Sequence, residues 1–168
     1  MKFYKLDSGW ATKYFWFDII ENFPPSEGKF IKRIKDNELT FTKQSGTTHA
    51  DVHCSTMTIN FFSEKFVNFL REQGIKNFKA YKIKFVPEMQ NIGNYYYLGL
   101  NDIILDKVTW NKIHSTLKDN VSFSIKNWNN QKIFGIFDTR YIIVTEDLKN
   151  LIEKQKFKNI KFEEIVPV

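Results

Sequence analysis

Hydrophobic and polar residues follow two different periods along this chain, and each period predicts a different kind of element. Alternation at every second residue predicts half-buried strands at Met57–Phe61 and Tyr81–Phe85. The continuous apolar run Tyr141–Val144 predicts a strand that is covered on both faces. Further strands are expected at Tyr95–Leu100, Ser122–Lys126, Lys132–Phe137 and Ile160–Ile165.

Two segments instead carry apolar residues at helical spacing. Ser63 and Thr145 stand where helices begin, because both are favourable N-cap residues and a glutamate follows each of them. The first helix is expected to end at Gly74, which adopts a left-handed cap conformation easily, whereas the second has Lys156 there and a weaker cap. The buried faces are predicted to be Phe66, Phe69 and Leu70 in the first helix and Leu148, Leu151 and Ile152 in the second.

These two segments are copies of each other. Residues 63–79 match residues 145–161 without a gap, at a constant offset of 82 residues, and six of the 17 positions are identical. With their flanking strands, the repeat units span residues of about 56–86 and 140–166, and each has the order strand–helix–strand. We therefore expect the two helices to occupy equivalent structural environments.

The remaining segments complete a strand-rich chain. Lys35–Glu38 is expected to form a hairpin turn between strands at Phe30–Ile34 and Leu39–Thr42, and Thr109–Leu117 a short helix. No segment has the composition of a linker between independent domains. The sequence thus predicts one α+β domain over residues 1–168, with a mixed or antiparallel sheet and two equivalent helices.

Composition and charge narrow the function. The net charge of +6 is spread evenly, at +2 in residues 1–50, 51–100 and 101–168, and only three of the 25 basic residues are arginines. This pattern makes nucleic-acid binding an unfavoured alternative. A single cysteine, an amino-terminal segment without the apolar run of a signal peptide, and no apolar run of membrane-spanning length together predict a cytoplasmic protein that does not enter membranes.

One cluster contains residues that could perform chemistry. His49, Asp51, His53 and Cys54 lie within six residues, and such side chains could hold zinc or form a nucleophile with its base. No second cluster completes a metal site, and the usual catalytic and phosphate-binding motifs are absent from the sequence. We therefore expect no metal, no cofactor and no catalytic residue, and an enzyme that uses the His49–Cys54 cluster remains an alternative.

The aromatic content suggests a binding surface. Phe, Tyr and Trp make up 17% of the chain, and exposed Tyr and Trp are frequent anchors of protein–protein contacts. Tyr95, Tyr96 and Tyr97 cannot all face one side of a strand, and Trp128 stands in a polar turn. The candidate partner-binding residues are Trp128, Tyr95, Tyr96, Tyr97 and Trp110; Trp10 and Trp16 are less favoured because the amino-terminal segment is expected to pack as an edge.

Several of these segments resemble one known family. The helix opening Ser63–Phe66, the strand Tyr95–Leu98 that leads to Asn101 and Asp106, and the closing segment Val144–Ile165, with its Lys161-Phe162-Glu163-Glu164-Ile165 end, resemble immunity proteins of bacterial polymorphic toxin systems. The resemblance is to the group numbered eleven, formerly a domain of unknown function, and its close relatives. It covers most of the chain after the first fifty residues.

The resemblance implies a non-enzymatic function. Such proteins are encoded beside a toxin, stay in the cytoplasm of the producing cell, and bind the cognate toxin domain to neutralise it. The even positive charge of this chain differs from the acidic surface expected of an inhibitor of a basic nuclease. It favours a toxin whose contact surface is acidic or neutral.

Overall fold

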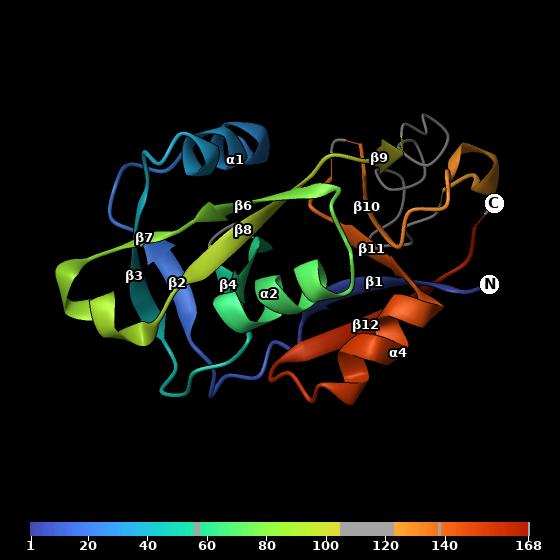
Figure 1. Cartoon of the computed structure of the whole chain (residues 1–168). Helices are drawn as coiled ribbons and strands as arrows, with labels where there is room; N and C mark the ends of the chain where they lie inside the picture. Colours follow the sequence, from blue (N-terminus) through green and yellow to red (C-terminus); the bar gives the residue numbers. More distant parts are fainter. Residues whose placement is uncertain (56–57, 105–122, 138, 168) are drawn as a thin grey trace. The chain divides into compact units, whose positions relative to one another are not determined.

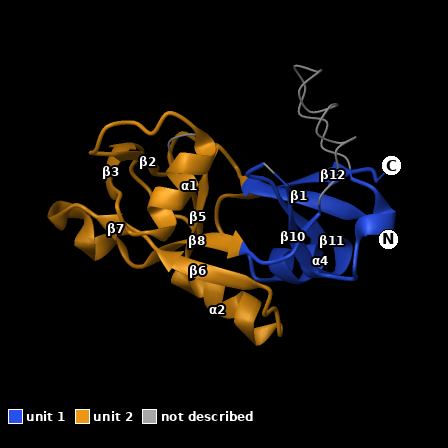
Figure 2. Cartoon of the chain, turned by 90° about the horizontal axis from the view of Figure 1, so that it is seen from above, with its two compact units in different colours: residues 1–7, 100–156, 161–168 blue, residues 8–99, 157–160 orange. Residues whose placement is uncertain are grey.

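The computed structural model describes residues 1–55, 58–104, 123–137 and 139–167 (Figure 1). The chain has an α+β fold and forms two compact units, each with its own sheet (Figure 2). Unit 1 comprises residues 1–7, 100–156 and 161–168, and unit 2 comprises residues 8–99 and 157–160. Within the described ranges, no helix is both long enough and apolar enough to cross a membrane.

Unit 2 contains a seven-stranded mixed sheet with the strand order β6-β8-β5-β4-β2-β3-β7. Two helices belong to this unit, α1 (Glu27–Lys35) and α2 (Glu64–Glu72). Its core is rich in phenylalanine, and Phe17, Phe30 and Phe61 are fully buried there. The strands are β2 (Trp16–Ile19), β3 (Thr40–Ser45), β4 (Val52–Ser55), β5 (Asn60–Ser63), β6 (Phe78–Lys82), β7 (Lys84–Phe85) and β8 (Tyr95–Leu100).

Unit 1 contains a five-stranded mixed sheet with the order β12-β1-β11-β10-β9 and the helix α4 (Glu146–Lys154). The amino-terminal strand β1 lies between β12 and β11, so the start of the chain is inside this sheet and not at its edge. Phe3 on β1 is fully buried against the rings of Phe123 and Phe134. The strands are β1 (Phe3–Ser8), β9 (Ile103–Ile104), β10 (Ile133–Ile136), β11 (Ile142–Thr145) and β12 (Ile160–Ile165).

The predicted repeat is confirmed in each unit. The segments β5–α2–β6 and β11–α4–β12 have the same order, and the helices α2 and α4 begin and end 82 residues apart. Each helix buries the predicted face, with Leu151 only partly buried. The buried helix residues are Phe66, Phe69 and Leu70 in α2 and Leu148 and Ile152 in α4.

The equivalence extends beyond the repeated sequence to five strands of each sheet. In unit 2 the strand that precedes the helix, β5, pairs antiparallel with β4. In unit 1 the corresponding strand, β11, pairs antiparallel with β10. Then β4 pairs parallel with β2 in unit 2, and β10 pairs parallel with β9 in unit 1. On the other side, β5 pairs with β8 and β11 pairs with β1, both antiparallel. The order β6-β8-β5-β4-β2 in unit 2 therefore matches β12-β1-β11-β10-β9 in unit 1.

Backbone hydrogen bonds fix which residues correspond. The Glu64 N–H donates to the Asn94 carbonyl oxygen at 3.0 Å, and the Glu146 N–H donates to the Lys2 carbonyl oxygen at 3.0 Å. The pairing registers place Tyr95–Leu98 of β8 where unit 1 has Phe3–Leu6 of β1. In unit 1, β1 therefore occupies the sheet position that β8 occupies in unit 2. The strand β1 precedes its helix in the sequence, whereas β8 follows its helix.

Two strand predictions are wrong. Phe30–Ile34 belongs to helix α1, because the Ser26 hydroxyl caps it by accepting from the Lys29 N–H, and Phe30 and Ile34 form one buried helical face. Lys35 is accordingly the last residue of this helix and Asp36 its C-cap, so Lys35–Glu38 is not a hairpin turn between two strands. In the predicted strand Ser122–Lys126, the described part is irregular and Ile125 begins a 3-10 turn.

Other predicted elements differ in extent. The strand expected at Met57–Phe61 begins only at Asn60, and the strand expected at Tyr81–Phe85 is divided into β6 and β7 on either side of Ile83. The predicted helix Thr109–Leu117 lies outside the described residues.

Candidate functional site

The three consecutive tyrosines of β8 have different environments. Tyr95 is 4% exposed, its hydroxyl donates to the Ala50 carbonyl oxygen at 2.8 Å, and burial raises its pKa to about 12. A side chain that is buried and bonded in this way packs as a core residue, although Tyr95 also lines a cavity of about 380 Å³ together with His49 and Asp51. Tyr96 and Tyr97 are each partly exposed, as the alternation along a strand allows.

Tyr96 and Tyr97 contact different neighbours. The Tyr96 hydroxyl donates to Glu64 Oε1 at 3.3 Å, at the start of α2. Tyr97 lies beside Tyr81, with 6.3 Å between the ring centroids, and burial raises the pKa of Tyr97 to about 12. The sequence candidate Tyr97 therefore lies beside Tyr81, a residue that lines the groove described below.

Trp128 is less exposed than the sequence suggested. Trp128 is partly buried, with its ring 5.1 Å from Phe3 in an edge-to-face contact, and its Nε1 donates to the Gln131 carbonyl oxygen at 2.9 Å. These contacts attach the turn to the core of unit 1. Trp110 lies outside the described residues. Trp10, which the sequence disfavoured, is 46% exposed, and its ring lies 5.2 Å from that of Trp16 in a tilted contact.

In the His49–Cys54 cluster, backbone groups form hydrogen bonds with both ring nitrogens of His53. Fully buried His53 accepts the Ala50 N–H at Nε2, 3.1 Å away, so its Nδ1 carries the hydrogen and donates to the Phe15 carbonyl oxygen at 3.0 Å. Burial lowers the His53 pKa to about 4, which keeps the ring neutral. Such a histidine has no ring nitrogen left for a metal or a substrate.

The other members of this cluster have different environments. Asp51 accepts from the Ser63 hydroxyl at 2.9 Å and from the Lys158 N–H at 2.8 Å, while Cys54 is buried. His49 is exposed and its ring lies against Phe15. Among the residues with described positions, no three His, Cys, Asp or Glu side chains are grouped closely enough to hold a metal ion.

A groove in unit 2 brings together residues that the sequence did not single out. Its volume is about 390 Å³, and it lies between the end of α1 and the consecutive strands β6 and β7. We name it the Tyr81 groove. It is lined by Ile34, Lys35, Asn37, Tyr81, Lys82, Ile83 and Lys84.

The Tyr81 ring is positioned by close packing. A Cβ atom added to Gly99 would lie 2.8 Å from Tyr81 Cε2, so a larger residue at position 99 would require the ring to shift. The ammonium groups of Lys35 and Lys79 lie over the ring, at 5.7 and 5.0 Å from its centroid. Ile34 and Ile83 are buried and provide an apolar floor.

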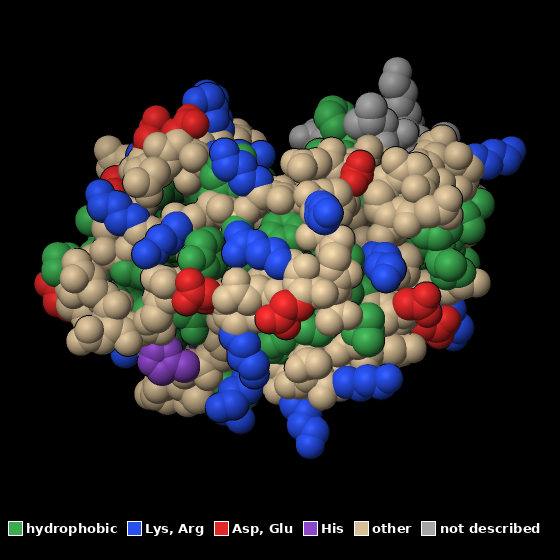
Figure 3. Space-filling model, in the orientation of Figure 1, with side chains coloured by type: hydrophobic (Ala, Val, Ile, Leu, Met, Phe, Trp, Pro, Cys, Tyr) green, Lys and Arg blue, Asp and Glu red, His purple; other side chains and the backbone are tan. Residues whose placement is uncertain are grey.

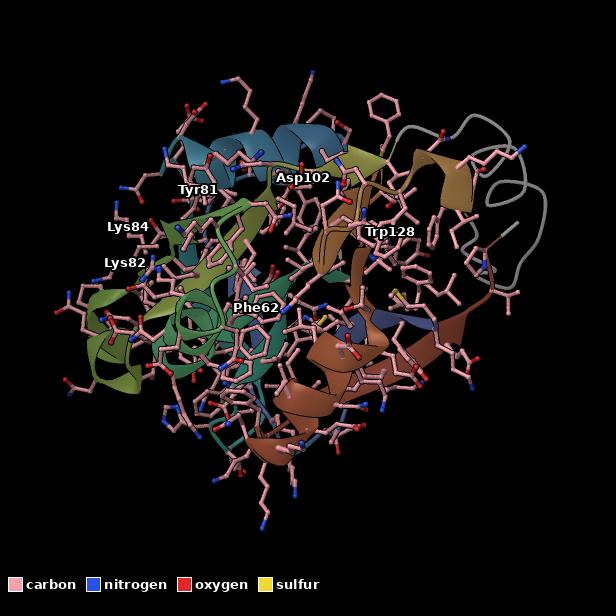
Figure 4. All side chains as sticks on the ribbon, turned by 45° about the vertical axis from the view of Figure 1, so that its right-hand side comes forward. Phe62, Tyr81, Lys82, Lys84, Asp102 and Trp128 are labelled. Atoms are coloured by element: carbon pink, nitrogen blue, oxygen red, sulfur yellow. The ribbon has the colours of Figure 1, made fainter. Side chains whose placement is uncertain are left out.

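The groove carries uncompensated positive charge. Lys35, Lys79, Lys82 and Lys84 are exposed, and within the described part of the chain none of them has a carboxylate within ion-pair distance. Figure 3 shows several blue Lys and Arg side chains over the area where Figure 1 draws α1, β6 and β7. Figure 4 shows Tyr81, Lys82 and Lys84 close together on this side of unit 2.

A signal for this groove was present in the sequence. The alternation over Tyr81–Phe85 places Lys82 and Lys84 on the same outward face, and it was used only to predict a strand. Lys35 could not be added, because it was assigned to a turn when it is in fact the last residue of a helix. Neither a protein-family model nor a curated protein matches this chain.

Proposed function

We propose that this chain is an immunity protein, which binds a cognate bacterial toxin domain in the cytoplasm and neutralises it by protein–protein contact. The observation that carries the proposal is the Tyr81 groove, an exposed cationic surface around one positioned aromatic ring. Its three lining lysines and the neighbouring Lys79 have no carboxylate partner in the described residues, so an acidic surface of a partner would neutralise them. The family resemblance of the sequence supports the same function.

The groove has features that suit a protein contact. Binding energy at protein interfaces is concentrated in a few anchors, often Tyr or Trp, that lie in well-packed surroundings. Tyr81 packs over Gly99, lies beside Tyr97 and has two ammonium groups over its ring, so these contacts restrict its side chain before binding. Charges around such an anchor accelerate association and select partners of the opposite sign. We therefore propose binding without turnover, and no enzymatic activity.

A second candidate function is the binding of single-stranded nucleic acid, which the lysines around Tyr81 also favour. Non-specific binding of this kind uses several aromatic rings with free faces along a track, on which successive bases stack. In the groove, Lys35 and Lys79 lie over the Tyr81 ring. This geometry leaves less room for base stacking, and it favours the protein partner.

Co-expression tests the proposal. The chain is produced together with the C-terminal toxin domain encoded by the adjacent gene, and both growth and co-purification are measured. We expect the chain to restore growth and to elute with the toxin domain as one complex. If the toxin domain inhibits growth equally with and without this chain, and no complex elutes, the proposed function is wrong.

A further inference from the structure

The charge of the Tyr81 groove is not a requirement of the fold. By the repeat, Tyr81 and Lys82 of β6 correspond to Glu163 and Glu164 of β12. In unit 1 both glutamates are paired within the unit, Glu163 with Lys5 and Glu164 with Lys2, each at 3.1 Å. The same strand position is therefore neutralised internally in one unit and left cationic in the other.

The neighbouring strand shows the same contrast. Lys5 of β1 corresponds to Tyr97 of β8, so the ion pair Lys5–Glu163 in unit 1 is replaced in unit 2 by the ring contact Tyr97–Tyr81. Like charges that lie close together are unfavourable unless counter-charges reach them. In unit 2 no carboxylate of the described residues supplies those counter-charges, so the ammonium groups are available to another molecule.

We infer that the Tyr81 groove binds an acidic segment of the partner protein, in which at least two Asp or Glu carboxylates contact the lysines around Tyr81. This inference rests on the proposed function and names the chemistry of the partner. Lys35 comes from the helix and Lys82 and Lys84 from the strands, so ammonium groups line both walls. A cavity of about 390 Å³ admits a few side chains.

Carboxylates fit this site better than a nucleotide does. The ammonium groups of Lys35 and Lys79 lie over the Tyr81 ring, where they can be bridged by carboxylate oxygens. A base would have to displace them before it could stack on the ring. Ile34 and Ile83, each 3% exposed, form the apolar floor of the groove and leave its polar contacts to the lysines.

The test uses the full chain and defined probes. Its amide spectrum is titrated with an eight-residue peptide of alternating Glu and Gly, with the same peptide carrying Gln for Glu, and with an eight-nucleotide oligothymidylate. The groove variant is the double substitution Lys82→Glu and Lys84→Glu. The matched control is Lys154→Glu and Lys161→Glu, which makes the same charge change at exposed positions of unit 1.

We expect the Glu peptide to shift the amides of β6, β7 and the end of α1, and the Gln peptide to shift none. The groove variant should bind the Glu peptide at least about tenfold more weakly and the control variant within about twofold of the native chain. Raising the ionic strength from 0.05 to 0.5 M should weaken the binding. Melting curves of both variants establish that they are folded.

Several results would overturn the inference. Equal binding of the Gln peptide, unchanged binding by the groove variant, or binding of the oligothymidylate in place of the Glu peptide would each exclude an acidic segment as the ligand. Co-purification with the toxin domain separates this failure from that of the proposed function. If the groove variant still forms the toxin complex, the inference fails and the proposed function stands.

Discussion

The two units of this chain have the same arrangement of five strands and one helix. They differ in whether the charged side chains of one equivalent strand form ion pairs within the unit. In unit 1, Glu163 and Glu164 of β12 are paired with lysines of β1. In unit 2, the equivalent strand β6 presents Tyr81 and Lys82 beside further lysines, and these lysines have no acidic partner among the described residues. The backbone pairing and the buried positions are thus common to both units, whereas the surface chemistry has diverged, and the divergence marks the candidate site.

Some equivalent buried positions also hold chemically different residues in the two units. His53 of β4 corresponds to Phe134 of β10, as the pairing of His53 with Phe61 and of Phe134 with Ile143 indicates. Both side chains are fully buried. A ring of similar size fills each position, but only the histidine needs hydrogen bonds and can take up a proton. Substitutions at matched positions can therefore distinguish side chains that the shared fold requires from side chains that only one unit requires.

The largest expected effect is at the buried faces of the two helices. Phe66→Ala and Leu148→Ala each remove a fully buried side chain, and we expect losses of about 3–5 and 2–5 kcal/mol in the free energy of unfolding. Asn68→Ala and Asn150→Ala, exposed and also 82 residues apart, serve as controls and should change it by less than about 0.5 kcal/mol. Urea denaturation measures all four. A loss below about 1 kcal/mol for Leu148→Ala would show that the two helices are not equivalent.

Acid should destabilise unit 2 through His53. The folded-state pKa is about 4 and the ordinary value is 6.5, so the unfolded chain binds the proton more tightly, and stability falls as the pH drops from 6.5 to 4. The loss is about 3 kcal/mol at pH 4 relative to pH 7. His49 and Asp51 are the charged groups that also act on this ring, and the ring of Tyr95 packs against it.

Unit 1 offers the control for this pH effect. His53→Phe places the residue of unit 1 in unit 2, so it should flatten the pH dependence over this range. It also leaves the Ala50 N–H and the Phe15 carbonyl without their partner, which should cost about 1–3 kcal/mol at pH 7. Hydrogen exchange at pH 5 and 7 should show lost protection in β4 and β5 but not in β10 and β11. Equal loss in both sheets would contradict the assignment to His53.

A smaller effect is expected at the two N-caps. The Ser63 hydroxyl accepts from the Phe66 N–H and donates to Asp51, so Ser63→Ala should cost about 1–2 kcal/mol. Buried Thr145 has no hydrogen-bond partner for its hydroxyl in the described structure. Thr145→Val keeps its shape, and should be neutral or stabilise by up to about 1 kcal/mol. Calorimetric melting of the two variants compares the caps directly, and a similar loss in both would show that Thr145 is also a working cap.

Local sequence patterns predicted the repeated segments well. The capping residues, the apolar spacing and the constant offset identified both helices and the strands next to them, because these elements are stabilised by near neighbours in the sequence. The helix at Glu27–Lys35 was missed because Phe30 and Ile34 were assigned to a strand although their spacing also fits a helical face. Its N-cap is Ser26, whose hydroxyl accepts from the Lys29 N–H.

Long-range pairing could not be predicted in this way. Nothing near Phe3–Leu6 in the sequence indicates that this segment pairs with β11, some 140 residues later, because register between distant strands depends on the assembled sheet. The Tyr81 groove is of the same kind, since Lys35, Tyr81 and Gly99 are brought together only by the fold. Tyr95 was misjudged for the related reason that burial on β8 is decided by the sheet and core around it.

The smallest expected effect concerns the residue that follows each helix cap. Gly74 has a φ of 73° and Lys156 a φ of 52°, so both adopt the left-handed conformation, which costs a residue with a side chain about 1 kcal/mol more than glycine. An added Cβ at Gly74 meets no atom within 4 Å, so Gly74→Ala should lose about 1 kcal/mol through the backbone alone. Lys156→Gly should gain a similar amount, and the double variant should be close to neutral. Urea denaturation of the three variants checks these signs; a loss of stability on Lys156→Gly would mean that the Lys156 side chain stabilises its unit in a way that Gly74 does not.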